Sequence, residues 1–222
     1  MEADARANCG WTRRIADDYD FLIRRAEYYL AANRFEPARL DYIKASLQAP
    51  HKPGPYVGLG LVALQTHDLQ KARTAFETAC RLDPACARAF CGLAIVNHTQ
   101  SRSEQALGMY CRCLELDGDN ITALLGLMEL SAQHGRFKEI KRFLRQYAVR
   151  HPEDVASRLA LAAVHLNEDQ FAAAREVLMD VLIIEPRNAT ASAILEELAH
   201  VQINTEIERA RQMYLIPNCS TA

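Results

Sequence analysis

Small and large apolar residues recur along this chain at intervals of 34 positions. Small or aliphatic residues mark one position of the interval: Ala38, Ala72, Ala106, Ile140 and Ala174. Large apolar residues mark the position four further on: Tyr42, Phe76, Tyr110, Leu144 and Leu178. Each interval closes on a proline or, once, on a glycine: Pro50, Pro84, Gly118, Pro152 and Pro186. A fixed period of this length is typical of proteins that stack copies of one supersecondary unit.

The spacing within each interval predicts two helices joined by a short turn. One stripe of a first helix carries apolar or small residues three, one and three positions apart, namely Tyr56, Leu59, Gly60 and Ala63. No stretch of the chain shows the alternation that indicates a strand. We expect the second helices to start with N-caps at Asn33, Ser101 and Asp169, since an acid three residues after the first two would complete a capping box.

These intervals resemble the tetratricopeptide repeat, a pair of antiparallel helices with large, small and proline residues at set offsets. The matching residues of one interval are Tyr56, Leu59, Gly60, Ala63, His67, Leu69, Ala72, Phe76, Ala79 and Pro84. The resemblance implies an all-α fold, a right-handed α-solenoid of helix-turn-helix repeats. The predicted boundaries are an N-terminal tail over 1–18, repeats over 19–52, 53–86, 87–120, 121–154 and 155–188, a partial sixth repeat with a capping helix over 189–216, and a tail over 217–222.

In that family one stripe of each first helix lines a groove that receives ligands, so the resemblance also implies a binding site. The matching stripes of this chain are largely apolar, and a helix that is apolar on both faces is normally covered on both. The candidate peptide-binding groove consists of Val57, Gly58, Leu61, Leu64, Arg88, Cys91, Gly92, Ile95, His98, Leu125, Gly126, Glu129, Leu159, Ala160 and Ala163. At its N-terminal end, Asp20, Arg24 and Glu27 are expected to form a polar lip.

Three glycines, Gly58, Gly92 and Gly126, recur on this stripe, followed by Ala160. A glycine inside a helix costs about 0.5 to 1 kcal/mol relative to alanine, so three at one position of the repeat need a reason. Two interpretations stay open at this point. The missing side chains leave a channel for a partner's backbone or large side chain, or neighbouring helices of the chain itself fill the space.

The groove positions that hold a terminal carboxylate in some family members are uncharged here, at Val57, Leu61 and Gly92 among others. An apolar groove suits an amphipathic helix or an extended segment with hydrophobic anchors. We therefore expect a non-enzymatic adaptor or scaffold with a protein or peptide partner. The apolar groove is also similar to that of the translocator chaperones of type III secretion. A homo-oligomer, in which a terminal segment fills a neighbour's groove, stays open as well.

A basic helix over 136–150 supports a third hypothesis, a binder of acidic protein surfaces or nucleic acid. Its cations form a predicted secondary patch: Arg136, Lys138, Lys141, Arg142 and Arg145. Apolar residues interleave with them at helical spacing, so the basic side faces water or an acidic partner. The formal net charge of the whole chain is only -2, which disfavours nucleic acid as the partner.

Composition and motifs exclude several other classes. The repeats fill the chain of 222 residues, which has no phosphate-cradling loop, no nucleophile motif and no histidine beside a cysteine or an acid at metal spacing. The cysteines between Cys80 and Cys113 raise a metal hypothesis, but Cys113 occupies the packed position of Ala79 one repeat earlier, which favours structural thiols. We expect no catalytic residue, no metal and no cofactor. The seven cysteines are expected to be reduced, packed thiols, because the sequence begins without a signal-peptide pattern. It also has no apolar run long enough to span a membrane, and the expected location is cytoplasmic.

The predicted N-terminal tail contains the only tryptophan of the chain, Trp11, followed by Arg13 and Arg14. Two interpretations apply to it. It is a frayed tail with one aromatic anchor on the first repeat, or it folds back into the protein's own groove.

Overall fold

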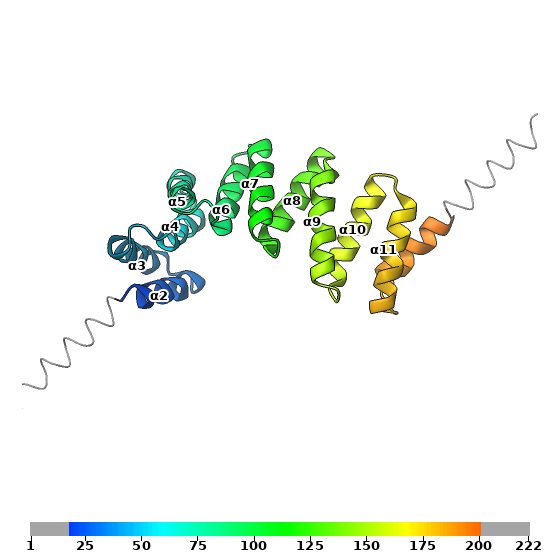
Figure 1. Cartoon of the computed structure of the whole chain (residues 1–222), viewed down its shortest axis with the longest axis horizontal. Coiled ribbons are helices and arrows are strands. Elements are labelled where there is room, and N and C mark those ends of the chain that lie inside the picture. The colour runs from blue at the N-terminus through cyan, green and yellow to red at the C-terminus, as the bar shows by residue number, and fades with distance from the viewer. Residues whose placement is uncertain (1–17, 201–222) are drawn as a thin grey trace, which may run out of the picture. The chain divides into compact units, whose positions relative to one another are not determined.

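The computed structural model describes residues 18–200 and consists there of helices joined by short turns. In chain order they are α2 (Tyr19–Ala31), α3 (Phe35–Gln48), α4 (Gly54–Gln65), α5 (Leu69–Leu82), α6 (Ala87–Thr99), α7 (Ser103–Leu116), α8 (Ile121–His134), α9 (Phe137–Arg150), α10 (Val155–Asn167) and α11 (Phe171–Ile184) (Figure 1). Helical residues resume at 189 and continue to 200, the last residue described. The predicted fold class is confirmed: the described chain is an all-α helical repeat solenoid with no strand between residues 18 and 200.

The chain divides into two compact units, 1–135 and 136–222, which we call unit 1 and unit 2. The division falls inside the predicted repeat 121–154, after α8. In unit 1 the first helices α2, α4, α6 and α8 contact one another in order, and each second helix contacts the first helix that follows it. In unit 2, α10 packs against both α9 and α11. The described part of the sixth first helix, 189–200, adds Ala191 and Ile194 to the apolar cluster of α10 and α11.

The turns between the paired helices differ from the sequence prediction. Asn33, Ser101 and Asp169 have φ of 56° and lie in the left-handed region, as do His67 and Gly135. The residue after each of the first three donates its N–H to a carbonyl five residues back, for example Arg34 N to Tyr29 O at 2.8 Å. This is the bond that closes the C-terminus of a helix at a left-handed residue.

The predicted N-caps are therefore wrong. Asn33, Ser101 and Asp169 end first helices, and the N-cap positions of the second helices fall one residue later. Among the second helices of the described chain, a side-chain N-cap hydrogen bond is made by Asp68, which accepts from Lys71 N at 3.1 Å. A polar residue between two helices can mark the start of the second helix or the end of the first. The short connection here places these residues at the end of the first helix.

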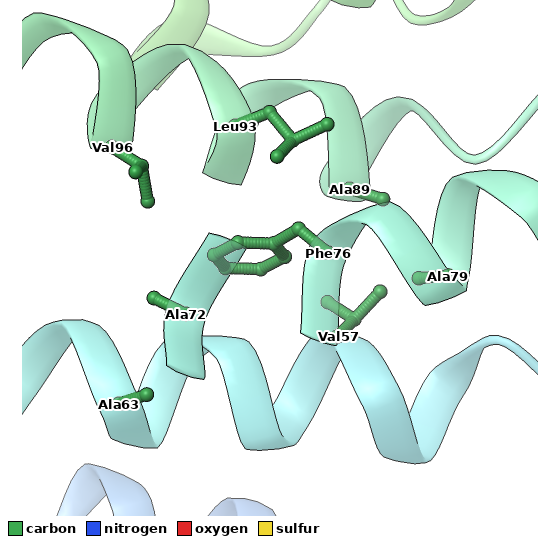
Figure 2. Packing of buried hydrophobic residues seen from close by; sticks show 8 residues of the cluster. All are labelled: Val57, Ala63, Ala72, Phe76, Ala79, Ala89, Leu93 and Val96. Carbon is green, nitrogen blue, oxygen red and sulfur yellow. The ribbon is translucent and has the colours of Figure 1, made fainter. Parts of the chain in front are cut away.

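The core of unit 1 centres on Phe76, whose side chain is fully buried between α4, α5 and α6 (Figure 2). Small residues bring the three helices close to the ring, and branched residues fill the remaining space; the cluster is Val57, Ala63, Ala72, Phe76, Ala79, Ala89, Leu93 and Val96. Burying a side chain of this size contributes about 1.5 to 3 kcal/mol. The recurrent small and large positions of the sequence are thus the contact points between consecutive repeats.

The recurrent glycines belong to the same packing. A Cβ built on Gly58 would overlap the ring of Tyr42, and one built on Gly92 would overlap the ring of Phe76. Gly126 stands in the same relation to Tyr110. Each of these three glycines therefore receives the aromatic ring of the preceding second helix. The channel interpretation of these three glycines is wrong, because the chain's own rings occupy the space that the missing side chains leave.

We predict that Gly92→Ala destabilises unit 1 although alanine favours helices. The added methyl group would press on the buried Phe76 ring, and overpacking of this kind costs about 1 to 3 kcal/mol. The matched control is Gly108→Ala on α7, where a Cβ would meet no atom within 4 Å. There the free energy of unfolding should rise by about 0.5 to 1 kcal/mol. Urea unfolding followed by circular dichroism measures both, and equal stabilisation by the two changes would refute the ring-on-glycine packing.

Candidate functional site

The side of α2, α4, α6 and α8 that turns away from the second helices is called here the first-helix face of unit 1. It contains a cavity of about 330 Å³. Four helices supply its lining, which consists of Glu27, Leu30, Ala31, Asn33, Tyr42, Leu61, Gln65 and Arg88. Tyr42 reaches it from α3, because its ring passes over Gly58. Of the predicted groove residues, Leu61 and Arg88 line this cavity, and Glu27 of the predicted polar lip joins them.

Opposite charges act on the Tyr42 hydroxyl in this cavity. Burial raises the pKa of Tyr42 to about 12, and the negative charge of Glu27 adds to the increase while Arg88 opposes it. The hydroxyl therefore stays protonated at neutral pH and keeps a proton to donate. Arg88 makes no hydrogen bond or ion pair with any residue of the described range 18–200. The cavity thus offers a guanidinium, a carboxylate and a phenol beside the apolar Leu61.

The remaining predicted groove residues of unit 1 differ in how accessible they are. Val57 and Cys91 are 3% and 7% exposed and lie in the core, so the expectation that they line an open groove is wrong. The exposed or half-buried ones are Leu64, Ile95, His98, Leu125 and Glu129. The hydrogen bond between the thiols of Cys91 and Cys113, together with burial, raises the pKa of the Cys113 thiol. This thiol pair is part of the packing between α6 and α7.

Three predicted groove residues belong to unit 2 and are described within it. Leu159 and Ala160 on α10 are half-buried, and Ala163 is exposed. Leu159 packs against the apolar cluster that α10 forms with α11. None of the three is among the residues that line the cavity of unit 1.

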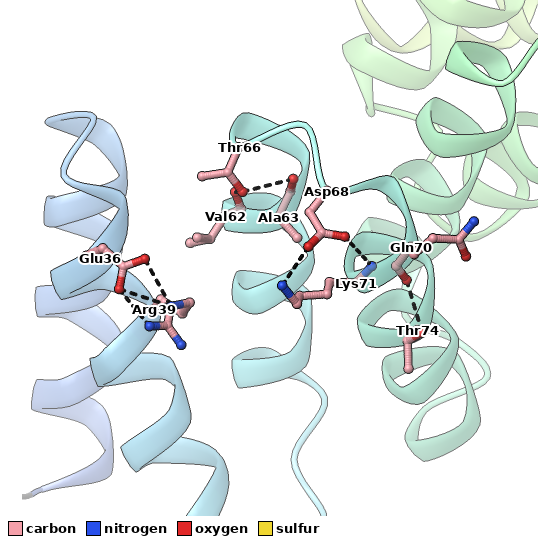
Figure 3. Close-up of polar contacts among 9 residues, drawn as sticks. All are labelled: Glu36, Arg39, Val62, Ala63, Thr66, Asp68, Gln70, Lys71 and Thr74. Carbon is pink, nitrogen blue, oxygen red and sulfur yellow. Dashed lines mark hydrogen bonds and ion pairs between the residues drawn. The ribbon is translucent and has the colours of Figure 1, made fainter.

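A larger concavity, which the sequence analysis missed, lies between α3 and α5 above α4. This α3–α5 cleft has a volume of about 920 Å³ (Figure 3). Its floor comes from α4 and its walls from α3 and α5; the lining residues are Glu36, Arg39, Ile43, Tyr56, Leu59, Val62, Ala63, Thr66, Asp68, Gln70, Lys71, Thr74, Ala75 and Thr78. One residue of the sequence could have indicated this cleft: Ala63, a small residue at the position where the family pattern has an aromatic one.

Comparison with the equivalent inter-repeat contacts explains why this cleft is open. One period after Arg39, Arg73 donates to Asn97 at 2.8 Å and to Gln100 at 2.7 Å in the next repeat. In unit 2, the equivalent Lys141 pairs with Glu168 of the next repeat and donates to Gln170 at 3.3 Å. These bonds tie a second helix to the first helix that follows.

The same bond is missing between α3 and α4. Ala63 stands where Asn97 stands one period later and has no polar side-chain atom. The Thr66 hydroxyl donates to the Val62 carbonyl of its own helix at 3.0 Å. Arg39 pairs instead with Glu36 of its own helix at 2.7 Å. Because no polar side chain links α3 to α4 at these positions, the cleft remains open.

The predicted basic patch of unit 2 is partly used within the unit. The Lys141 side chain is 15% exposed and is paired with Glu168. Arg145 Nη2 lies 3.3 Å from His165 Nε2, and His165 Nδ1 lies 2.7 Å from Gln170 Oε1, so the ring accepts from Arg145 and donates to Gln170. Arg142 lies over the Phe143 ring at 4.4 Å. Of the predicted cations, Lys138 and Arg136 are exposed near the start of α9.

Two other kinds of site are absent from residues 18–200. In that range no three histidine, cysteine or acidic side chains are grouped so as to hold a metal ion. No described helix has the length and apolar character needed to cross a membrane.

The described residues form an all-α helical repeat protein with concavities on two sides of α4. The model of the tetratricopeptide repeat family matches residues 57–121, the region of α4 to α7. The match identifies the region of α4 to α7 as similar to tetratricopeptide repeats, and it points to no subfamily. No curated protein sequence matches the chain significantly.

Solved structures agree on the fold. PilF of Pseudomonas aeruginosa superposes with a TM-score of 0.62 at 17% identity, covering 92% of this chain and 93% of that one. YrrB, described as a tetratricopeptide-repeat protein with an unusual peptide-binding site, superposes with a TM-score of 0.58 at 20% identity. The match covers 85% of this chain and 97% of that one. Yeast Tom70 gives 0.60 at 18% identity and covers 88% of this chain and 42% of its own. At these identities the likeness concerns the fold.

The raised pKa of Tyr42 predicts a sensitivity to alkali. The folded state holds the phenol proton more tightly than the unfolded state, so the contribution of this residue is present below pH 10 and is lost as the pH rises toward 12. The loss is on the order of 2 kcal/mol. Tyr42→Phe should remove this part of the decline in unfolding free energy between pH 9 and 12 (roughly the range that the shift spans), measured by urea titration. The same change at Tyr28, which is 68% exposed, should leave the decline as it is.

Proposed function

We propose that this chain is a non-enzymatic scaffold, located in the cytoplasm, that binds a segment of a partner protein on the first-helix face of unit 1. The observation that carries the proposal is Arg88, which has no hydrogen-bond or ion-pair partner among residues 18–200 and lines a cavity with Leu61 and Tyr42. A guanidinium with no partner beside an apolar surface favours a ligand that has both an acidic and an apolar group.

The surface around the cavity extends the apolar part of the site. Leu64 and Ile95 are half-buried on the same stripes of α4 and α6, and Leu125 on α8 is 55% exposed. Apolar anchors spaced along such a stripe suit an amphipathic helix or an extended segment. The expected ligand therefore places one apolar side chain on Leu61 and an acidic side chain against Arg88, while Glu27 selects against a second acid nearby.

The structural neighbours support a binding function by analogy. The YrrB description names a peptide-binding site, and a solved complex of Naa15 with Naa10 and HypK, whose TM-score is 0.63 at 14% identity, shows this fold within a protein assembly. Secretion-type chaperoning and self-assembly would use the same face with a different occupant. The basic-helix hypothesis is less favoured, because Lys141 and Arg145 are engaged within unit 2.

We predict that Arg88→Glu weakens capture of the partner about tenfold or more, because the reversed charge would repel the acidic group that the guanidinium attracts. The purified variant and the wild type would be immobilised and exposed to extract from the native source, and the bound proteins identified and titrated. Arg81→Glu is the matched control, since it makes the same charge reversal at an exposed position of α5 outside the cavity. Equal retention by the two variants would remove Arg88 from the site.

A further inference from the structure

The α3–α5 cleft is on the opposite side of α4 from the first-helix face and plays no part in the function proposed above. We propose that it is the docking site of the chain's own N-terminal segment, with the Trp11 side chain on the floor of the cleft. Trp11 lies outside the described residues. The proposal rests on the shape and chemistry of the cleft and on the place where the described chain begins.

The floor of the cleft has room for an aromatic ring. One period before Ala63 the chain has Tyr29, and one and three periods after it Asn97 and His165. The residue two periods after Ala63 is Ser131, so Ala63 and Ser131 are the two small members of this series. Ala63 lies beside the apolar side chains of Leu59 and Val62. A ring of indole size placed above Ala63 would cover these side chains and remove their remaining surface from water.

The walls of the cleft supply the polar partners that an indole needs. A buried indole N–H has to donate a hydrogen bond, and it accepts none. The hydroxyls of Thr66 and Thr74 each donate to a carbonyl of their own helix, both at 3.0 Å, so their oxygen lone pairs are left to accept (Figure 3).

The charged side chains of the walls fit an aromatic occupant as well. Glu36 with Arg39, and Asp68 with Lys71, are ion pairs within one helix, so the cleft has no net charge that would repel the segment. The Arg39 side chain is 44% exposed and can turn its guanidinium over a ring. The chain uses this contact elsewhere, for example with Arg25 over Phe21 at 5.0 Å.

The described chain begins close enough for Trp11 to reach the cleft. The Lys52 Nζ atom lies 3.9 Å from the centre of the Tyr19 ring, which places the start of α2 beside the loop that leads into α4. Tyr56, two residues after the start of α4, lines the near end of the cleft. The eight residues from Trp11 to Tyr19 span at most about 26 to 29 Å. The helix from Tyr56 to Thr66 is about 15 Å long, so the whole floor is within reach.

Covalent connection favours this occupant over a free peptide. A short linker gives the segment an effective concentration in the millimolar range, so even weak packing of one ring keeps the cleft occupied.

The test uses the full chain and the fluorescence of Trp11, its single tryptophan. In the wild type we expect emission at short wavelength and slow quenching by acrylamide. Ala63→Leu fills the floor, and Thr78→Arg, on the exposed wall, blocks the near end without touching the core. In both variants the emission should move to longer wavelength and the quenching constant should rise severalfold, with the helical circular dichroism spectrum unchanged. If Ala63→Leu disturbs folding, Thr78→Arg alone decides the matter.

Gln65→Leu is the matched control, because Gln65 lies on the same helix but lines the cavity of the first-helix face. It should leave Trp11 fluorescence unchanged. Three results would overturn the proposal: a Trp11 that is already fully accessible to acrylamide in the wild type, an equal response in Gln65→Leu, or protection that disappears on dilution. The second would place the segment on the first-helix face, and the third would assign the cleft to a second copy of the chain.

Discussion

The packing of unit 1 depends on the contact between an aromatic ring on one second helix and a glycine on the next first helix. Tyr42, Phe76 and Tyr110 make this contact with Gly58, Gly92 and Gly126. Because glycine has no Cβ, the ring approaches the helix backbone directly and is buried on all sides. The helix propensity that each glycine sacrifices, about 1 kcal/mol, is smaller than the gain from burying the ring. Stacking of the repeats therefore requires both residues together.

The polar contacts between consecutive repeats differ from one repeat to the next, whereas the contact of ring and glycine recurs. Where Arg73 meets Asn97 and Gln100, side chains from both repeats close the surface between α5 and α6. At the equivalent positions Arg39 and Ala63, no polar contact joins α3 to α4, and a cleft remains. The rings hold the repeats together in either case, so the polar positions are free to differ between repeats without loss of the fold. This freedom is how a repetitive scaffold acquires individual surfaces.

Two such surfaces result on the two sides of α4. One surface has a cavity lined by Glu27, Arg88 and Tyr42, and the two opposite charges act on the Tyr42 hydroxyl. The other combines an apolar floor with hydroxyl groups and ion pairs that are already satisfied. The first has an unpaired guanidinium and suits a charged partner segment, whereas the second suits an aromatic group with a single donor. The first surface depends directly on Gly58, over which the Tyr42 ring passes, and the second depends on the stacking that positions α4.

The sequence by itself determined the helices, the period of the repeat and the residues at which consecutive repeats touch, because a stripe of small and large residues at helical spacing can be buried in few other ways. It could not decide between two uses of Gly58 and Gly92, since a missing side chain looks the same whether a ligand or the chain's own ring takes its place. The prediction of helix starts at Asn33 and Ser101 was wrong, because the residues favoured in left-handed turns and those favoured as N-caps are the same polar types. Tertiary structure decided these points. The Tyr42 and Phe76 rings reach glycines of the next repeat, and no polar contact joins Arg39 to the helix of Ala63. Both features depend on residues 16 to 24 positions apart that only the packed helices bring together.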